Sequence, residues 1–241
     1  MTSILAINED LDYSKLYLKP PMKSSGNLKY MLFFYNKQKL VFRLPKLTLP
    51  YGINRYGDNM YLDFSLKNND QILYKLQELD VEIVTLIHKM FPEHAIDDII
   101  NNFQSGVKIP MNMSFAPTLR VKLTRDKSGE YTFSLYSTEK DIDGNYKSYH
   151  PTCDDEVADI LTKKSEVSSL IELAGVWYNV ADRKFGVTWR LVQAKVFTIK
   201  ALFKKPPVVP EEEGEGESRE TNGYAFQDDT DSDSSDDGNE A

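Results

Sequence analysis

Short segments in which apolar and polar residues alternate recur along this chain, and only one long segment follows a helical period. Alternation with a period of two is typical of a half-buried strand, whereas apolar residues spaced by three and four indicate an amphipathic helix. The helical period covers 69–91, through Ile72, Leu73, Leu76, Leu79, Ile83, Val84, Ile87 and Met90. These patterns predict a mainly β (α+β) fold with one inserted amphipathic helix.

The remaining predicted elements are short and are bounded by turn-forming residues. They are hairpins at 28–35 with 39–44 and at 119–123 with 131–135, a strand at 60–66, and helices at 95–103 and 154–164. The segment YGINRYGDN, 51–59, is rich in glycine, asparagine and tyrosine, and it is predicted to be a loop.

The last two predicted strands are 167–180 and 187–197, joined by a loop at 181–186. The second of them has apolar residues on both sides, which favours a central position in a sheet. About seven strands and one long helix favour an OB-like β-barrel, since that small barrel commonly carries a helix between strands.

The charge of the chain is divided unevenly along its length. Residues 206–241 contain thirteen acidic residues and one basic residue, whereas 1–205 contain twenty-eight basic and twenty-four acidic residues. A segment as acidic as 206–241 buries too little apolar surface to offset the entropy lost on ordering. We therefore predict an OB-like domain over 1–205, followed by a disordered acidic tail over 206–241.

Several classes of protein are disfavoured by what the sequence contains. The single cysteine, Cys153, forms no intrachain disulfide, which fits a reducing compartment. The first residues do not have the pattern of a secretory signal, and no apolar run approaches the roughly 18 residues of a membrane helix. We expect a soluble, intracellular protein that does not span a membrane.

The sequence also offers little support for an enzyme. His150 and Cys153 in HPTC supply two metal ligands, fewer than the four typical of structural zinc sites. A nucleophilic Cys153 would need an activating base, and neither a phosphate-binding P-loop nor a G-x-G-x-x-G motif is present. We predict no catalytic residue, no metal and no cofactor.

Rings lie beside cations in three parts of the chain: 29–43, 51–56, and the strand face at 120–122 together with 177–190. Single strands of nucleic acid are held by a positive groove along the phosphates and by rings that stack on bases. The candidate nucleic-acid-binding residues are Tyr35, Lys37, Lys39, Arg43, Tyr51, Arg55, Tyr56, Arg120, Lys122, Trp177, Tyr178, Arg183, Lys184, Phe185, Trp189 and Arg190. The alternative is that the strand rings form the core and the strand cations face solvent.

The acidic tail has two interpretations. A flexible polyanion tethered to a basic groove would compete with nucleic acid at high effective concentration, and once displaced it could recruit basic partners. Salt would weaken both interactions. The alternative is a tail that only improves solubility.

Three segments carry a resemblance to a known family: APTLRVKLTRDKSGEYTFSLYSTEKD, GVWYNVADRKFGVTWRLVQAKV and the acidic end. Over roughly 28–200 the layout resembles the single-stranded DNA-binding proteins of large double-stranded DNA viruses and some tailed phages. The resemblance implies an OB-fold that coats displaced strands in viral DNA replication, recombination and repair, with the tail recruiting replication proteins. It also implies a viral replication site in the host cytoplasm or nucleus.

By matching position, the resemblance assigns strand binding to Arg120, Lys122, Trp177, Tyr178, Lys184, Phe185, Trp189 and Arg190. The end of the tail departs from the phage pattern, because phage tails often finish on an aromatic residue and this chain finishes on Ala241. The rings of the tail are internal, at Tyr224 and Phe226, so these would have to serve in docking.

The sequence thus predicts a single-stranded DNA-binding protein and leaves two alternatives open. One is a β-rich virion or assembly protein whose rings form the core. The other is an acidic histone-binding, chaperone-like protein in which the tail is the active part. Only the first alternative predicts no affinity for single strands with or without the tail, and only the second predicts that deleting the tail abolishes binding of a basic partner.

Overall fold

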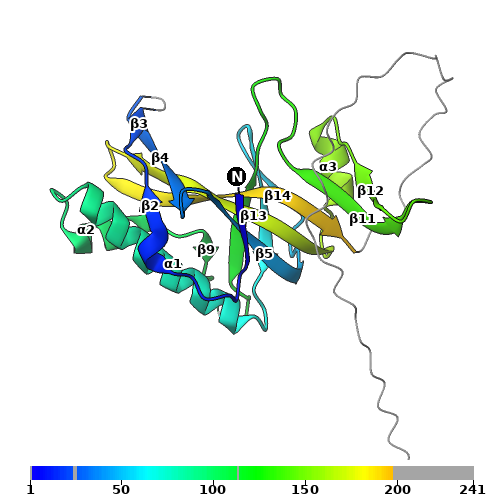
Figure 1. The fold of residues 1–241 in the computed structure, drawn as a ribbon, viewed down its shortest axis with the longest axis horizontal. Coiled ribbons are helices and arrows are strands. Elements are labelled where there is room, and N and C mark those ends of the chain that lie inside the picture. Colours follow the sequence, from blue (N-terminus) through cyan, green and yellow to red (C-terminus); the bar gives the residue numbers. More distant parts are fainter. Residues whose placement is uncertain (1, 24–25, 113, 198–241) are drawn as a thin grey trace, which may run out of the picture. The chain divides into compact units, whose positions relative to one another are not determined.

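The computed structural model describes residues 2–23, 26–112 and 114–197 (Figure 1). The predicted acidic tail, 206–241, and the predicted domain boundary at residue 205 lie outside these residues. None of the helices in the described ranges is both long and apolar enough to cross a bilayer.

Two long antiparallel strands, β13 (Glu166–Asn179) and β14 (Lys184–Val196), form the centre of the sheet. They correspond to the last two predicted strands, and the central position predicted for the second is confirmed. The register between them shifts twice, between Leu170 and Ile171 and between Leu173 and Gly175. Such irregularities strengthen the local twist of a strand pair, and the two strands cross the fold as a twisted ribbon (Figure 1).

Strands β4 (Leu28–Tyr35) and β5 (Lys39–Thr48) both pair with β13 rather than with each other. The predicted strands exist, but the predicted hairpin is wrong. A tight turn with positive φ at Asn36 and Lys37 brings only Tyr35 and Gln38 together as a bridge. Beyond that bridge the two strands follow one another along β13, with β4 beside 175–179 and β5 beside 166–172.

The second predicted hairpin differs from the structure in the same way. Strands β10 (Thr118–Leu123) and β11 (Ser134–Lys140) meet only near their turn, where Arg125 and Tyr131 form a bridge. Both then lie parallel to β14, at Lys122 with Arg190 and at 134–137 with 193–196. Both mispredicted hairpins are therefore pairs of strands laid end to end against the central ribbon.

The remaining strands extend the sheet to either side. The sheet path runs β1-β5-β13-β14-β10-β7-β6, and β1 is parallel to β5. The strands not yet given are β1 (Thr2–Ala6), β2 (Leu16–Leu18), β3 (Met22–Lys23), β6 (Ile53–Tyr56), β7 (Asn59–Ser65), β8 (Phe103–Gln104), β9 (Val107–Lys108) and β12 (Tyr146–Tyr149).

The segment 51–59, predicted to be a loop, contains β6 and its turn into β7. Gly57 adopts a φ of 56°, a left-handed conformation that favours glycine. The turn pairs Tyr56 with Asn59 and continues as an antiparallel ladder up to Ile53 with Leu62. The composition of this segment is typical of a turn, but pairing with β7 holds 53–56 in a strand. The loop prediction was wrong for that reason.

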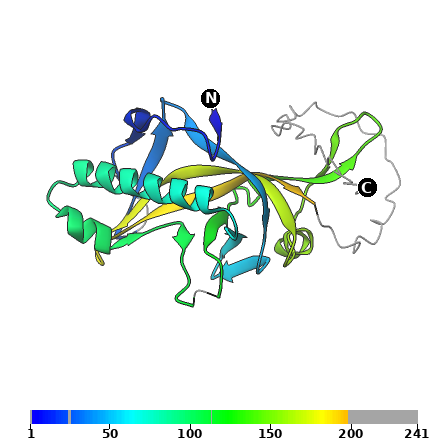
Figure 2. The ribbon, with the colours of Figure 1, turned by 90° about the horizontal axis from the view of Figure 1, so that it is seen from below.

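Three α-helices and one 3-10 turn occupy the described ranges: α1 (Asp70–Met90), α2 (Ile96–Asn101), α3 (Asp154–Ile160) and η1 (Tyr13–Lys15). All three helices occur where the sequence predicts them. The apolar stripe of α1 is buried, from Ile72 to Ile87, and the helix runs along one face of the sheet (Figure 2).

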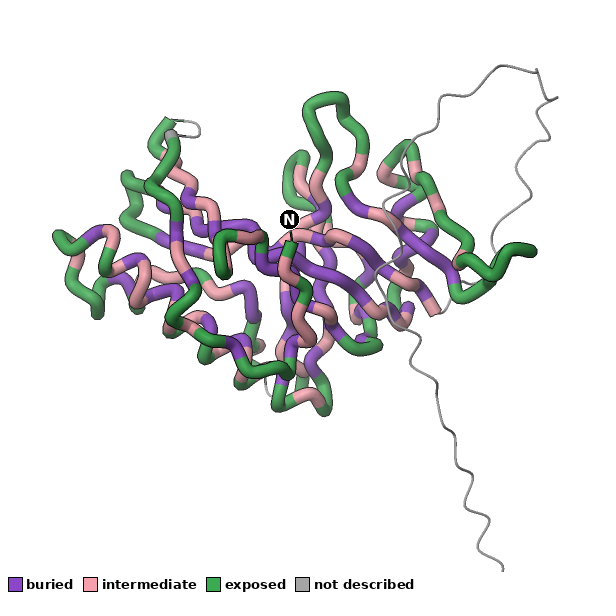
Figure 3. Tube along the Cα trace, viewed as in Figure 1, coloured by how far each residue is buried: buried purple, intermediate pink, exposed green. Residues whose placement is uncertain are grey.

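The core lies between α1 and the curled sheet, where buried residues follow the central strands (Figure 3). It contains the inward residues of the central ribbon and of β5, β7 and β10, including Phe42, Phe64 and Leu191. The mainly β class with an inserted amphipathic helix is confirmed, and the arrangement is consistent with an OB-like fold. The other face of the sheet is left for polar and aromatic side chains.

Candidate nucleic-acid interface

Strand alternation builds a basic and aromatic face opposite the core. On β10, Leu119, Val121 and Leu123 are buried, whereas Arg120 and Lys122 point to the other side. Successive side chains of a strand point to opposite faces, so the same rule applies to the strands beside it. The predicted division of this strand into an apolar and a basic face is confirmed.

This face is hollowed into a groove with a volume of about 690 Å³. It crosses β4, β13, β14, β10 and β7, and residues 104–108 border it. The lining residues are Leu28, Tyr30, Tyr56, Tyr61, Gln104, Ser105, Gly106, Lys108, Arg120, Lys122, Thr124, Ala174, Trp177, Val187, Thr188, Trp189 and Arg190. Four of them are cationic and none is a carboxylic acid.

Six predicted site residues are brought together in this groove: Tyr56, Arg120, Lys122, Trp177, Trp189 and Arg190. Their role in binding stays a prediction. The two tryptophans differ, because Trp177 is half-buried while Trp189 is only 3% exposed and packs 5.9 Å from the ring of Phe42. Trp189 therefore belongs mainly to the core, and its burial disfavours the predicted use as a stacking ring.

One end of the groove is formed by two tyrosines and an arginine. Tyr56 is 55% exposed, and its ring meets that of Tyr61 edge-on at 5.9 Å. The guanidinium of Arg120 lies 5.0 Å from the ring centroid of Tyr56 and 5.7 Å from that of Tyr61. Cation–π contacts of this kind hold the rings and the charge in a fixed arrangement.

Both groove arginines are anchored by buried carboxylates. Arg120 Nε and Nη2 donate to the two carboxylate oxygens of Asp63 at 2.8 Å each, and Asp63 is 3% exposed. Arg190 Nε and Nη2 both donate to Oε2 of Glu172, at 2.8 and 2.6 Å. The hydrogen bonds that Arg120 donates to Asp63 raise the pKa of Arg120 further above its ordinary value. These pairs fix the guanidiniums but neutralise much of their charge.

The two groove lysines are placed differently. Burial lowers the pKa of Lys122, and within the described ranges it has no ion-pair partner. Burial, and then the nearby charge of Arg120, lower the pKa of Lys108, whose Nζ donates to the carbonyl of Ser105 at 3.3 Å. A phosphate beside either ammonium would relieve this electrostatic cost. Neither lysine is held in a salt bridge within the described ranges, although the charges of Asp63 and Asp80 partly oppose the lowering of the Lys108 pKa.

The border of the groove is tied to α1 through Asp80. Ser105 Oγ donates to Asp80 Oδ2 at 2.5 Å and accepts from the Val107 N–H at 2.9 Å. Burial raises the pKa of Asp80 to about 6, although the bond from Ser105 and the charge of Lys108 oppose the rise.

Asp80→Asn is expected to stabilise the fold at pH 8 by at most about 3 kcal/mol, the free energy of a rise in pKa from 3.8 to about 6. The folded pKa is raised above the unfolded one, so ionised Asp80 lowers stability as pH increases from about 4 to 6. The benefit of asparagine should therefore disappear near pH 4. Urea unfolding at pH 4, 6 and 8 measures this, and a pH-independent difference would contradict it.

Four predicted residues at the β13–β14 hairpin do not line the groove. Tyr178 and Phe185 are 4% and 1% exposed, and their rings stack at 4.2 Å with an interplanar angle of 4°. Both rings lie on the core face against Phe91, so their burial disfavours a ligand contact, which stays a prediction. Lys184 is exposed at the start of β14 and shares strand parity with Thr188 and Arg190, which places it on the groove face beyond the lining.

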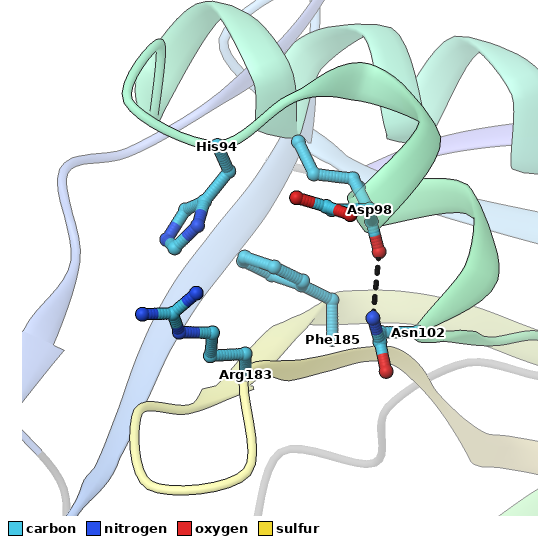
Figure 4. Close-up of a pocket in the computed structure, with 6 residues that line it drawn as sticks. His94, Asp98, Asn102, Arg183 and Phe185 are labelled. Atoms are coloured by element: carbon cyan, nitrogen blue, oxygen red, sulfur yellow. Dashed lines mark hydrogen bonds between the residues drawn. The ribbon is translucent and has the colours of Figure 1, made fainter.

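Arg183, with a φ of 52° in the turn, lines a separate hollow of about 140 Å³. Figure 4 shows its guanidinium near His94, with Phe185 between them and α2. Asn102 Nδ2 donates to the carbonyl of Asp98 at 2.9 Å, and Tyr178 Oη lies 3.0 Å from His94 Nε2. This small hollow is bounded by α2 and the hairpin, so Arg183 does not join the groove.

The predicted residues of 35–55 are dispersed, and none lines the groove. Tyr35 packs on the core and Lys37 is exposed in the turn, while Lys39 Nζ lies 4.0 Å from Glu172. The other three are Arg43, half-buried on β5, Tyr51, exposed before β6, and Arg55, whose Nη2 donates to Asp155 at 3.1 Å. Of the candidates in the segments 29–43 and 51–56, only Tyr56 lines the groove.

The structure adds three cationic or aromatic lining residues that were not among the sixteen candidates. Tyr30 and Tyr61 alternate with buried residues of their strands, so strict alternation could have identified them. Lys108 lies in a strand of two residues, and no periodicity marks it. In the described part of the chain, no group of three or more His, Cys, Asp or Glu residues is arranged to hold a metal ion.

Comparison with known proteins gives few relatives. No protein-family description matches the chain. An uncharacterised protein of Acanthamoeba polyphaga mimivirus is 25% identical over 169 residues, which is 67% of this chain and 26% of that protein. This chain thus spans about a quarter of the length of that relative. The crystal structure of gp2.5, a single-stranded DNA binding protein encoded by bacteriophage T7, matches with a TM-score of 0.41 and 14% identity, covering 78% of this chain and 100% of that one.

Proposed function

We propose that this chain is a non-catalytic protein that binds single-stranded DNA in the groove across β4, β13, β14, β10 and β7. One observation carries the proposal: the groove lining combines four cations and four partly accessible rings with no carboxylic acid. A single strand needs both, because its phosphates are negative and its bases expose flat faces. The two arginines, held by Asp63 and Glu172, give the groove a fixed geometry. The two lysines give it net positive charge.

The dimensions of the groove fit a short stretch of strand. It crosses four inter-strand spacings of about 4.8 Å each, or about 19 Å in total. We expect an occluded site near the low end of the roughly 4–16 nucleotides found for OB-folds. Stacking tolerates every base because every base has a π-face, so sequence preference should be small.

The same proposal extends to biological role. Coating of displaced strands in viral DNA replication, recombination and repair would use such a sequence-tolerant groove. The predicted competition of the tail with nucleic acid for the groove, and its predicted recruitment of replication proteins, concern 206–241. These residues lie outside the described ranges, so both stay predictions from the sequence. So does location at a viral replication site inside the host cell.

Fluorescence anisotropy of labelled oligo-dT with the full chain tests the proposal. We expect binding that weakens with salt, and weaker binding of a duplex of equal length, since paired bases hide their faces. Absence of binding to single strands at low salt would overturn the proposal and leave a role in virion assembly or in binding basic proteins.

The double variant Lys108→Ala/Lys122→Ala is expected to reduce the slope of log affinity against log salt by about 1.4, since each phosphate contact on a single strand contributes about 0.7. Anisotropy titrations at several salt concentrations measure the slope. The matched control is Lys89→Ala/Lys163→Ala, which removes the same charge from exposed positions that do not line the groove. Equal slopes for the two double variants would contradict phosphate binding by the groove lysines.

A further inference from the structure

Trp177 lies against a glycine on the neighbouring strand. In the β13–β14 register, Trp177 pairs directly with Gly186. A Cβ added to Gly186 would lie 2.3 Å from Cζ2, 2.6 Å from Cε2 and 2.9 Å from Nε1 of Trp177. These are its three nearest heavy atoms, and all belong to the indole. The ring therefore occupies the space that any other side chain at 186 would fill.

Part of this indole is accessible from the groove. Trp177 is half-buried and lines the groove, and no other ring of the described residues pairs with it. Tyr30 of β4 pairs with Trp177 in the sheet register and also lines the groove. A Cβ on Gly175 would first meet the carbonyl oxygen of Met31, at 2.3 Å, and then Tyr30 Cε1, at 2.9 Å. Backbone as well as ring therefore excludes a side chain at 175, whereas at 186 the indole alone fills the space.

Trp189 provides an internal contrast. A Cβ on Gly106 would lie 2.4 Å from Cδ1 and 2.6 Å from Nε1 of Trp189. Here too an indole occupies the space beside a glycine, but Trp189 is buried in the core beside Phe42. A glycine under a ring is therefore not sufficient to make a ligand surface; the ring must also be accessible, as Trp177 is.

We propose that Gly186 is a positioning residue that holds Trp177 flat on the groove floor, so that an unpaired base stacks face-down on the indole. This inference rests on the proposed function and names how the site selects its ligand. A base within a duplex has both faces covered by its neighbours, so only an unstacked base offers a face to a ring lying in the plane of the sheet. Any larger residue at 186 would tilt the indole off the sheet and remove that platform.

A double-mutant cycle with oligo-dT tests the coupling between Gly186 and Trp177. Trp177→Ala should weaken binding roughly 5- to 150-fold, the equivalent of about 1–3 kcal/mol for one stacked base. Gly186→Ala should weaken it in the same direction. In the Trp177→Ala background, Gly186→Ala should cause no further loss, because the residue acts only through the ring.

A second readout follows the ring itself. In a Trp189→Phe background, saturation with oligo-dT should quench the fluorescence of Trp177, and Gly186→Ala should reduce that quenching. The matched control is Gly144→Ala, at a glycine with a left-handed φ of 82° that does not line the groove, which should lower the free energy of unfolding while leaving the quenching of Trp177 unchanged. Urea unfolding of each variant separates loss of fold from loss of the platform.

The outcomes distinguish this inference from the proposed function. If the wild-type chain does not bind oligo-dT, the proposed function is overturned and the inference with it. If the wild type binds, but Gly186→Ala weakens binding equally with and without Trp177, only the positioning role is overturned. Unchanged affinity and unchanged quenching in folded Gly186→Ala would overturn it as well.

Discussion

Phe185→Ala is expected to lower the free energy of unfolding by about 3–5 kcal/mol, as large-to-small changes of buried aromatic residues do. Phe185 is 1% exposed, stacks on Tyr178 at 4.2 Å and lies 5.8 Å from the ring of Phe91. Its loss would leave a cavity where the end of α1 meets the central ribbon. Urea unfolding followed by circular dichroism measures the change.

The same variant separates a core role from a ligand role. Affinity of folded Phe185→Ala for oligo-dT should equal that of the wild type, because the ring points away from the groove. Phe115→Ala is the matched control, since Phe115 is 58% exposed and its loss should change stability by no more than about 0.5 kcal/mol. Normal stability with impaired binding in Phe185→Ala would restore Phe185 to the ligand site.

The elements of this fold could be predicted because periodicity is a local property. The stripe from Ile72 to Ile87 is sufficient to predict α1, and the alternation through Leu119, Val121 and Leu123 is sufficient to predict β10 and its basic face. Strand pairing is not local. Strand β4 pairs with the long central ribbon, and β10 pairs mainly with β7 and at Lys122 with β14; nothing within either segment encodes those choices.

Only part of the site could be predicted, because the position of a side chain in the groove also depends on more than local composition. Composition identified the segments rich in rings and cations, but the face on which each ring lies follows from strand parity. Trp177 and Tyr178 are consecutive in one strand, so they point to opposite faces and cannot both line one groove. Phe185 was assigned to a loop, so the alternation that buries it was not applied. Lys108 enters the groove through a crossing segment that only the tertiary structure positions.

Buried carboxylates beneath a groove for an anion require a physical explanation. An arginine on a strand has several flexible torsions, and fixing it over the sheet costs side-chain entropy. Asp63 offsets that cost with two hydrogen bonds to Arg120 and accepts a third from Asn54 Nδ2 at 2.9 Å. The result is a fixed guanidinium with most of its charge neutralised. Asp63 therefore fixes the position of the Arg120 guanidinium but weakens its attraction for phosphate.

Asp63→Ala should therefore have opposite effects on stability and on binding. Breaking a buried ion pair typically costs 3–5 kcal/mol, and we expect about 3 kcal/mol here because the side chain of Arg120 is 28% exposed and can reach water. The folded variant should nevertheless bind oligo-dT more tightly at low salt, since the groove gains one unit of positive charge. Its salt slope should steepen by up to about 0.7, one further phosphate contact.

Asp63→Asn distinguishes charge from geometry in this prediction. Asparagine keeps the volume and one acceptor for Arg120, so the loss of stability should be smaller, while the gain in net charge is the same. Both variants should then show a similar rise in affinity, measured by anisotropy at two salt concentrations, with unequal unfolding free energies from urea titration. If affinity instead falls in both variants, the fixed position of the Arg120 guanidinium matters more to the bound strand than its free charge. The Asp63 carboxylate would then contribute to binding indirectly, by holding the Arg120 guanidinium in the position that the strand requires.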